Sequence, residues 1–369
     1  MKRSLALLSL AVLTLSQAAC TPSTKIKLGL IAPLTGDVAG LGADVLHGAQ
    51  MAVDKINANG GINGHQIDLI AEDGRCTGAD AANAAQKLVN VDKVFAIVGG
   101  LCSGETLAAA PIVEAGKIVL LSPTSSSPDV TKAGDYVFRN YPSDALKTTA
   151  MAKYFADNKI AKVAMITENT DFSQAFRASL KEKLPKDAVV FDEVVDPGTK
   201  DFRTLMTRLK DIKADAFFPN GNSDSVIGPM VQQLREAGIK ITAITHDAGD
   251  SVTMAKNVPE AEGMYAINVS SSTKDPTFEK DFQTKYGDPK YGISFAGYAY
   301  DSVDVITQGI ASGAADSVAL KDWLYKMPTF AGVVGTFHFD SNGDVVGIPY
   351  VLKQYKGGKI ETLKDIVVE

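Results

Sequence analysis

The sequence has few of the residues, and none of the motifs, on which most enzyme sites depend. Only four histidines and three cysteines occur in 369 residues. No G-x-S-x-G elbow, H-E-x-x-H helix, close His/Cys cluster, G-x-G-x-x-G turn or P-loop is present. A serine nucleophile needs a base, usually histidine, beside it. The sequence therefore predicts no catalytic residue, no metal site and no cofactor.

A strong charge of one sign is also missing. The chain has 37 Lys and Arg against 43 Asp and Glu, a formal net charge of −6, and no basic run interrupts it. Nucleic-acid grooves concentrate positive charge, so this pattern argues against such a partner. With 45% hydrophobic residues the composition is that of an ordinary globular protein. The length suits two domains of about 150 residues each.

Long apolar runs are missing too, apart from the start of the chain. Residues 1–19 combine a basic tip with an apolar run from Leu5 to Leu15 and small residues before Cys20. This run is far shorter than the roughly 20 residues of a spanning helix, and the whole pattern is typical of an export signal. We predict a signal peptide over 1–19, a tether over 20–25, and an exported body in the periplasm or at the cell surface.

The end of this signal leaves two outcomes open. Cys20 is a lipidation candidate, because it follows the signal and precedes a polar segment, TPSTK. Gln17, however, stands three residues before Cys20, where a lipobox usually carries leucine. Cleavage after Ala18 by an ordinary signal peptidase is the alternative, and the protein would then carry no lipid at this cysteine.

The other two cysteines each follow a predicted strand. Cys76 comes just after the strand expected at Gln66–Asp73, and Cys102 just after Val94–Val98. Neighbouring parallel strands bring such ends together, and exported proteins meet an oxidising compartment. We therefore predict a disulfide between Cys76 and Cys102. A redox-active pair is the alternative, but no Cys-x-x-Cys spacing supports it.

Apolar runs of strand length alternate with segments of helical periodicity from Ile26 onward. Continuous apolar strands separated by amphipathic helices predict a doubly wound parallel sheet. The alternation starts again near Ala145, which indicates two α/β units in tandem, with the best linker at Ser270–Pro276. The expected division assigns residues 26–144 plus 274–333 to lobe 1, and residues 145–273 plus 334–369 to lobe 2.

Two hydroxyl-rich segments follow neighbouring predicted strands. GGLCSGETLAAAP (99–111) places Ser103 where a helix N-cap is expected, and LSPTSSSPDVT (121–131) has four hydroxyls between two prolines. A helix start offers free N–H groups that suit a carboxylate, and adjacent strand ends of a doubly wound sheet form the ligand crevice. These loops predict a site for a polar small molecule. The alternatives are that Ser103 only caps its own helix, or that it is a hydrolase nucleophile, for which no base is visible.

These segments carry a resemblance to a known family. The run from Ile26 to Asp73, followed by CTGADAANAAQKLV and both hydroxyl-rich segments, is similar to the leucine/isoleucine/valine-binding family, the periplasmic binding proteins of branched-chain amino acid ABC transporters. The similarity continues through TKDFRTLMTRLKDIKADAFFPNG, EAEGMYA and GTFHFDSNGD, and covers essentially the whole mature chain. It implies a type I periplasmic binding protein, in which two doubly wound α/β lobes joined by a hinge of three crossovers close on one amino acid.

The resemblance assigns the head group of the ligand to both lobes. Ser103 and Ser126 would hold the carboxylate, together with nearby backbone N–H groups, and the Thr124 carbonyl would accept from the ammonium. Asp247, after the strand KITAIT, stands at the place of the family's acidic ammonium partner, which is often glutamate. The family also has a disulfide at the cysteine pair predicted above.

The side-chain pocket departs from the branched-chain prototype. Leu41 replaces a frequent aromatic residue, Phe172 takes the place of a tyrosine that closes over the ligand, and Asn222 stands where the prototype has another tyrosine. Phe295 and Tyr298 are expected to approach from the linker region. Taken alone, Leu41 fits loop packing equally well, Phe172 fits a core position and Asn222 fits a turn.

The predicted function is that of the solute-binding component of an amino-acid ABC transporter. We expect a monomer that performs no chemistry, binds a small or aliphatic L-amino acid and delivers it to a permease in the inner membrane. Its membrane contacts would be that permease and a lipid at Cys20. Two alternatives share the fold, namely a site for another carboxylate, such as an aromatic acid or γ-aminobutyrate, and a sensory receptor that signals to a membrane partner.

Overall fold

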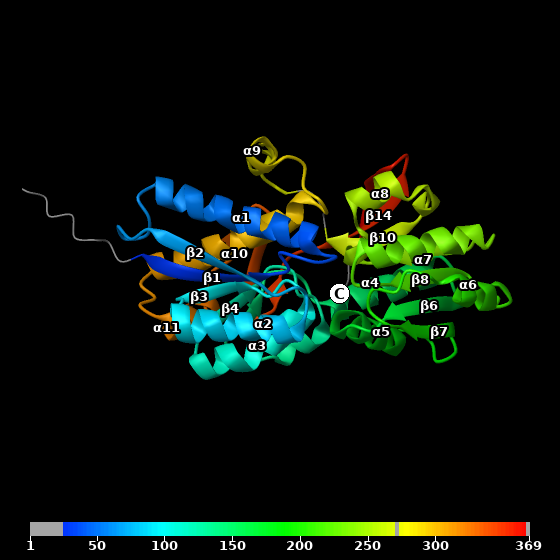
Figure 1. Ribbon diagram of the computed structural model, residues 1–369, viewed down its shortest axis with the longest axis horizontal. Coiled ribbons are helices and arrows are strands. Elements are labelled where there is room, and N and C mark those ends of the chain that lie inside the picture. The colour runs from blue at the N-terminus through cyan, green and yellow to red at the C-terminus, as the bar shows by residue number, and fades with distance from the viewer. Residues whose placement is uncertain (1–24, 270–272, 367–369) are drawn as a thin grey trace, which may run out of the picture.

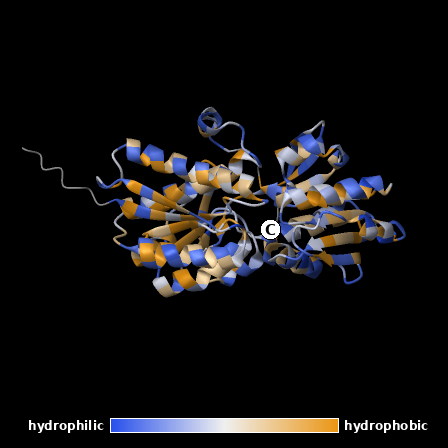
Figure 2. Ribbon diagram, in the orientation of Figure 1, coloured by the Kyte–Doolittle hydropathy of each residue, from blue (hydrophilic) through white to orange (hydrophobic). Residues whose placement is uncertain are grey.

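The computed structural model describes residues 25–269 and 273–366, which form two α/β halves side by side (Figure 1). The predicted signal peptide, Cys20, the tether up to residue 24, and residues 270–272 of the predicted linker lie outside these residues. Apolar residues gather in the strands, and polar residues colour the outer faces of the helices (Figure 2). In the described part of the chain, no helix is both long and apolar enough to cross a membrane.

The first half is built on a five-stranded parallel sheet in the order β2-β1-β3-β4-β5. Alternate residues of a strand face opposite sides of the sheet, and here both sides are apolar. In β3, Val98 joins the core under α1 and α10, whereas Ile97 joins the core under α2 and α3. The strands are β1 (Ile26–Ala32), β2 (Ile67–Asp73), β3 (Ala96–Gly99), β4 (Val119–Ser122) and β5 (Val137–Arg139). The helices are α1 (Ala39–Ala58), α10 (Ile293–Ala311), α2 (Gly78–Gln86) and α3 (Ser103–Gly116).

The second half has a seven-stranded sheet in the order β15-β14-β10-β9-β8-β6-β7, with β14 antiparallel to both of its neighbours. Helices α4 and α5 pack on one face and α6 and α7 on the other, while α8 lies beside α7. The strands are β6 (Val163–Glu168), β7 (Val189–Val195), β8 (Ala216–Asn220), β9 (Thr242–Thr245), β10 (Tyr265–Val269), β14 (Tyr350–Lys356) and β15 (Lys359–Ile366). The helices are α4 (Asp144–Asp157), α5 (Asp171–Lys183), α6 (Arg203–Lys210), α7 (Asp224–Glu236) and α8 (Val252–Asn257).

A third, small antiparallel sheet belongs with the first half. It is formed by β11 (Phe330–Ala331), β12 (Thr336–Phe339) and β13 (Val345–Val346), and it follows α9 (Pro276–Tyr286) and α11 (Ser317–Leu324). The Phe339 ring lies 5.4 Å from that of Phe138 in β5, and Asp344 pairs with the buried Arg139 at 2.6 Å. The lobe boundaries stay a prediction, and these contacts favour placing the third one after residue 346 rather than at 333.

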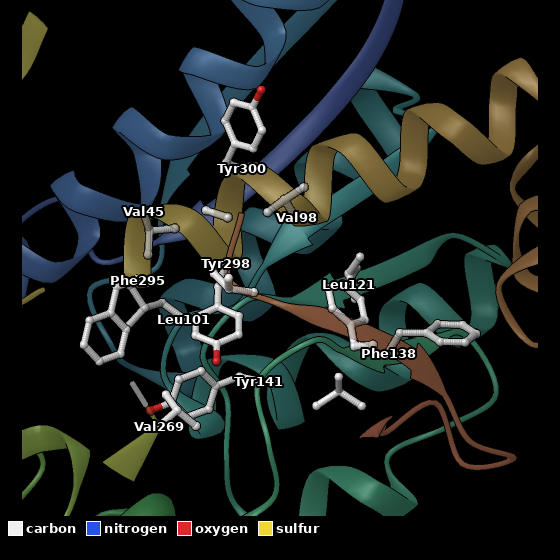
Figure 3. Close-up of a cluster of buried hydrophobic side chains, with 14 of the residues drawn as sticks. Val45, Val98, Leu101, Leu121, Phe138, Tyr141, Val269, Phe295, Tyr298 and Tyr300 are labelled. Carbon is white, nitrogen blue, oxygen red and sulfur yellow. The ribbon is translucent and has the colours of Figure 1, made fainter. Parts of the chain in front are cut away.

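The chain passes between the halves three times, after β5, after β10 and after β13. Tyr141, in the first passage, donates a hydrogen bond to Oδ1 of Asn268 at the end of β10, at 2.6 Å. Its ring also packs edge-on against Tyr298 of α10, at 4.9 Å (Figure 3). Two doubly wound lobes joined by three crossovers are the architecture that the family resemblance implies, and the hinge is packed with aromatic side chains.

Candidate ligand-binding site

A pocket lies between the two lobes, where the loops after several parallel strands meet. Side chains from both lobes line it. Seven of the residues predicted for the ligand site are among them: Leu41, Ser103, Thr124, Ser126, Phe172, Asn222 and Asp247. In a doubly wound sheet this edge is where ligands bind. The structure brings these residues together at that edge, and their role in binding stays a prediction.

Ser126 lies in the loop after β4 and presents an unused polar group to the pocket. Its side chain is 1% exposed, and its Oγ has no hydrogen-bond partner among the described residues. The neighbouring Ser125 differs, because its Oγ contacts the Gly100 carbonyl at 3.1 Å and the Thr106 hydroxyl at 2.7 Å. Buried hydroxyls are almost always partnered, so the Ser126 hydroxyl is suited to donate to a bound molecule.

Ser103 also faces the pocket, but not as the helix cap that the sequence predicted. Helix α3 begins at Ser103, and the N-cap residue is Cys102. The Ser103 Oγ instead accepts a hydrogen bond from the backbone N–H of Ser127, at 3.2 Å. Because its oxygen is used as an acceptor, its hydroxyl proton is available to donate into the pocket. The N-cap prediction is wrong by one residue, and the prediction that Ser103 meets the second hydroxyl-rich loop is confirmed.

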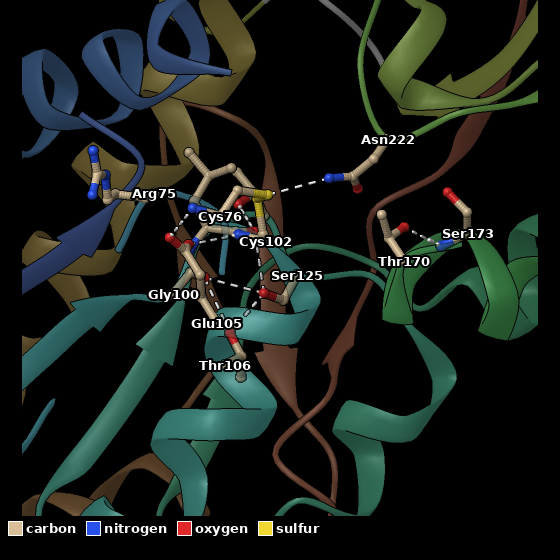
Figure 4. Close-up of a disulfide and its surroundings, with 12 residues drawn as sticks. Arg75, Cys76, Gly100, Cys102, Glu105, Thr106, Ser125, Thr170, Ser173 and Asn222 are labelled. Carbon is tan, nitrogen blue, oxygen red and sulfur yellow. Dashed lines mark hydrogen bonds between the residues drawn. A yellow bond between two sulfur atoms is a disulfide. The ribbon is translucent and has the colours of Figure 1, made fainter. Parts of the chain in front are cut away.

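The carboxylate of Glu105 organises the start of α3 and ties it to the predicted disulfide. It accepts hydrogen bonds from the backbone N–H groups of Leu101, Cys102 and Cys76, each at 2.9 Å. Burial raises the pKa of Glu105 to about 7, although these three hydrogen bonds act in the opposite direction. Cys76 and Cys102 form a disulfide with their Cα atoms 5.4 Å apart, as the strand-end argument predicts (Figure 4).

Asp247, from the second lobe, is already engaged by a lysine. Its Oδ1 lies 2.9 Å from Nζ of Lys147, which lies 2.7 Å from Oδ1 of Asp144. The side chains of Lys147 and Asp144 are 0% exposed. Burial would raise the pKa of Asp247, but the Lys147 ammonium holds it well below its usual range. Lys147 was not predicted as a site residue, because within ALKTTAMAKYF no motif distinguishes it from an ordinary helix residue.

His246 supports the pocket wall and offers no free base. Its Nδ1 accepts from the Ala248 N–H at 3.2 Å, and its Nε2 lies 2.9 Å from Oδ1 of Asn220. Since the amide nitrogen of Asn220 donates to the Ser173 carbonyl, its Oδ1 must accept, which places the imidazole proton on Nε2. The His246 ring packs at right angles against Phe172, 5.0 Å away. Both ring nitrogens of His246 are therefore engaged in hydrogen bonds within the second lobe.

Contacts across the pocket hold the two lobes together. Asn222 follows β8, and its backbone N–H donates a hydrogen bond to the carboxylate of Glu168 at 2.7 Å. This bond fixes the position of Asn222. Its side-chain amide donates to Sγ of Cys76 in the other lobe at 3.2 Å (Figure 4). The Tyr291 hydroxyl donates to Asp224 of the second lobe at 2.8 Å. The structure is therefore that of a closed clamp.

Two aromatic residues near the hinge differ from expectation. Phe295 lines the pocket, as predicted, and so does Tyr291, which the sequence analysis did not single out. Tyr298 does not line it, because its side chain is 1% exposed and packs against Tyr141 in the hinge (Figure 3). Phe295 and Tyr298 are three residues apart in α10 and lie on the same side of the helix, where both rings pack against Tyr141. Of the two, Phe295 also lines the pocket.

The family described as periplasmic binding protein matches residues 25–359 of this chain. The chain belongs to the periplasmic binding protein family. Within this family it is 30% identical to the Leu/Ile/Val-binding protein BraC3 of Rhizobium johnstonii over 342 residues, which are 91% of this chain and 93% of the relative. The resemblance stated from the sequence is therefore confirmed.

Solved structures share the fold of this periplasmic binding protein. The branched-chain amino acid substrate-binding protein LivJ of Streptococcus pneumoniae, in complex with isoleucine, is 30% identical, has a TM-score of 0.84, and is matched over 93% of this chain and 99% of its own. A solute-binding protein from R. palustris in complex with benzoate is 19% identical, with a TM-score of 0.80, over 93% of this chain and 96% of its own.

In the part of this chain that the structure describes, no group of three or more His, Cys, Asp or Glu residues is placed to hold a metal.

Proposed function

We propose that this periplasmic binding protein is the solute-binding component of an ABC transporter. It captures a small or aliphatic L-amino acid between its lobes and delivers it to a membrane permease. It performs no covalent chemistry, acts as a monomer, and is exported, with Cys20 as the attachment point of a lipid. The observation that carries this proposal is that Ser103 and Ser126 of one lobe and Asp247 of the other line a single pocket.

The lobe with Ser103 and Ser126 suits the carboxylate of the ligand. Both hydroxyls have a proton to donate, and within the described residues no donor reaches the carbonyl oxygen of Thr124, which is therefore free for an ammonium. Hydrogen bonds to charged groups contribute about 1.5–3 kcal/mol each. Two or three of them, with burial of a small aliphatic chain, reach the roughly 8 kcal/mol of micromolar binding before association costs.

The rest of the pocket suits an apolar side chain. Leu41 and Phe295 line it from one lobe, and Phe172 lines it from the other. Phe172 is held in place by the His246 ring, so its position does not depend on the ligand. Apolar walls of this kind discriminate only modestly between aliphatic chains that differ by a methylene group. Recognition of the head group should therefore dominate the affinity.

Closure explains how binding could be signalled to a permease. The contacts Tyr291–Asp224 and Asn222–Cys76 join the two lobes and can form only when the lobes are together. A ligand that touches both lobes adds its own contacts to the same closed state. It therefore shifts the equilibrium between open and closed forms towards the closed form, by hinge motion of two rigid lobes.

Calorimetric titration of ligand-stripped protein with the twenty amino acids tests this proposal. We expect heat from one or a few small or aliphatic amino acids, and a loss of affinity of tenfold or more in Asp247→Asn. Asp187→Asn, an exposed carboxylate of the same lobe, serves as the matched control and should bind like the wild type. No heat from any amino acid would overturn the proposed ligand class.

A second candidate is a carboxylate that lacks the α-ammonium. The observation that favours it is the ion pair between Asp247 and Lys147, which leaves less of the Asp247 charge for a ligand. Asp247→Ala distinguishes the two candidates, because little loss of affinity for the best ligand would favour an acid without an ammonium beside that site. The fold accommodates such ligands, since the R. palustris protein in complex with benzoate shares it.

A further inference from the structure

Lys147 is a buried cation placed directly behind Asp247, the acidic residue that lines the pocket in the described part of the chain. It projects from the first turn of α4, with its side chain 0% exposed. Its Nζ lies 2.9 Å from Asp247, 2.7 Å from Asp144 and 5.4 Å from the centre of the Tyr141 ring. Asp144 is sealed from solvent, whereas the Asp247 side chain is 10% exposed and reaches the pocket. The ammonium of Lys147 is thus bound to the same carboxylate that a ligand would use.

The other charges around this group are already balanced by partners. Asp250 is paired with Lys353 and accepts from the Asn268 amide at 2.8 Å. His246 also borders the group, with its Nδ1 3.3 Å from Oδ1 of Asp247 and its Nε2 2.9 Å from Oδ1 of Asn220. Asp144 and Asp247 therefore share the ammonium of Lys147, and of these two carboxylates Asp247 is the one that lines the pocket.

We propose that Lys147 determines the charge class of the ligand, by relaxing the requirement for an α-ammonium so that the pocket binds small carboxylates with or without one. A ligand ammonium beside Asp247 would share that carboxylate with Lys147, and two like charges at one partner repel each other, most strongly where water is excluded. A ligand without the ammonium meets a carboxylate whose charge Lys147 partly offsets, although Asp144 shares the same ammonium. This inference rests on the proposed function, since it concerns the same pocket.

Two variants isolate the charge of Lys147. The first variant, Asp144→Asn, leaves Lys147 paired with Asp247 alone, so that one positive and one negative charge remain. The second, Asp144→Asn/Lys147→Met, also removes the lysine charge. Because Asp144 is already neutral in it, this double variant leaves no second buried carboxylate without a partner. Each protein is titrated with L-leucine and with 4-methylpentanoate, which has the same carbon skeleton without the amine. The measured quantity is the ratio of the two dissociation constants, acid over amino acid.

We expect this ratio to be roughly tenfold or more higher in the double variant than in Asp144→Asn, because the competing cation next to Asp247 is gone. We also expect it to be lower in Asp144→Asn than in the wild type, because the lysine then has a single partner. The comparison of Asp144→Asn with the wild type uses only proteins that retain the Lys147–Asp247 pair. It can therefore be made even if the double variant does not fold.

Equal ratios in all three proteins would overturn the role of Lys147 while leaving the solute-binding function in place. Wild-type protein that binds neither 4-methylpentanoate nor any of the twenty amino acids would overturn the proposed ligand class, and this inference with it. Thermal melting of each variant, checked for reversibility, shows whether a lost signal comes from the pocket or from unfolding.

Discussion

The hydroxyl of Tyr291 donates a hydrogen bond to the carboxylate of Asp224 at 2.8 Å, and this bond joins the two lobes beside the pocket. Tyr291 is held by Asp44 of α1, which accepts from the backbone N–H groups of Lys290 and Tyr291 at 2.8 and 3.0 Å. Burial, together with the nearby Asp224, raises the pKa of Tyr291 above its usual range, so the hydroxyl keeps its proton and remains a donor. Asp224 also accepts from Ser251 at 2.6 Å, within its own lobe.

Tyr291→Phe should therefore weaken ligand binding without unfolding the protein. The bond it removes exists only in the closed form, and a hydrogen bond to a charged group is worth about 1.5–3 kcal/mol, so we expect affinity to fall by roughly tenfold or more. Asp224 keeps Ser251 as a partner. Calorimetry gives the affinity and thermal melting of the unliganded protein gives the stability.

The matched control for this variant is Tyr325→Phe. The Tyr325 hydroxyl donates to the Asp135 carbonyl at 3.1 Å, within lobe 1 and away from the pocket. This change should leave ligand affinity unaltered. Equal affinities for Tyr291→Phe and the wild type would show that the Tyr291–Asp224 contact does not contribute to closure.

Ser126→Ala and Ser125→Ala should separate binding from stability, although the two serines are adjacent and both are 1% exposed. The Ser126 hydroxyl has no partner in the described structure, so its loss should leave the free energy of unfolding within about 0.5 kcal/mol of wild type and reduce affinity about tenfold or more. The Ser125 hydroxyl forms buried hydrogen bonds with Thr106 and with the carbonyls of Gly100 and Leu101, so Ser125→Ala should lower the free energy of unfolding by about 1–3 kcal/mol. Chemical denaturation and calorimetry check both values, and the reverse pattern would contradict the assignment.

The strand ends and their hydroxyls could be predicted because their signal is local. A continuous apolar run such as that around Ile97 and Val98 predicts a buried parallel strand, and the polar residues that follow it must lie at one edge of the sheet. Ser103 and Ser126 were expected to share one pocket on this ground, and both line it. The N-cap of α3 lies one residue earlier than predicted, at Cys102, and the Glu105 side chain accepts from the N–H groups of Leu101 and Cys102 there.

Tyr291 and Lys147 could not be predicted, because long-range contacts give them their roles. Tyr291 follows DPK in a segment without periodicity, and it is positioned by Asp44, 247 residues earlier in the chain. Lys147 shares the buried face of α4 with Met151 and Tyr154, but only the fold brings Asp247 to it. Tyr298 was expected near the pocket together with Phe295, three residues earlier on the same side of α10, but the sequence does not show that Tyr141 from the first crossover packs over it.

Glu105 should make the stability of the protein fall as the pH rises from about 4.5 to about 7. Burial raises its pKa in the folded state to about 7 from an ordinary value of 4.5. Between these values the folded protein keeps a proton that the unfolded chain has lost, so raising the pH favours unfolding. The difference of about 2.5 pKa units corresponds to about 3 kcal/mol as an upper value.

Glu105→Gln provides the comparison, because it has no proton to titrate at this position. It should be less stable than the wild type, since its amide has fewer acceptors for the three N–H groups. The gap in unfolding free energy between the two proteins should narrow between pH 4.5 and pH 7 by about 2–3 kcal/mol. A gap that is constant or widens over this range would contradict the raised pKa.

Replacing both cysteines should destabilise the protein and weaken ligand binding. The disulfide closes a loop with a sequence separation of 26, for which the loop-entropy model gives about 3 kcal/mol. Cys76→Ala/Cys102→Ala should lower the free energy of unfolding by this amount, measured with denaturant, and weaken ligand binding because Cys102 lines the pocket. A loss below about 1 kcal/mol would show that the disulfide does not constrain the unfolded chain as this model assumes.

The most direct test of the site is a crystal structure of the protein with the ligand that copurifies with it. The account predicts a small carboxylate in the pocket, with its carboxylate oxygens within hydrogen-bond distance of Oγ of both Ser103 and Ser126, and its apolar part against Phe172. A ligand whose carboxylate avoids both serines, or a ligand without a carboxylate, would contradict it.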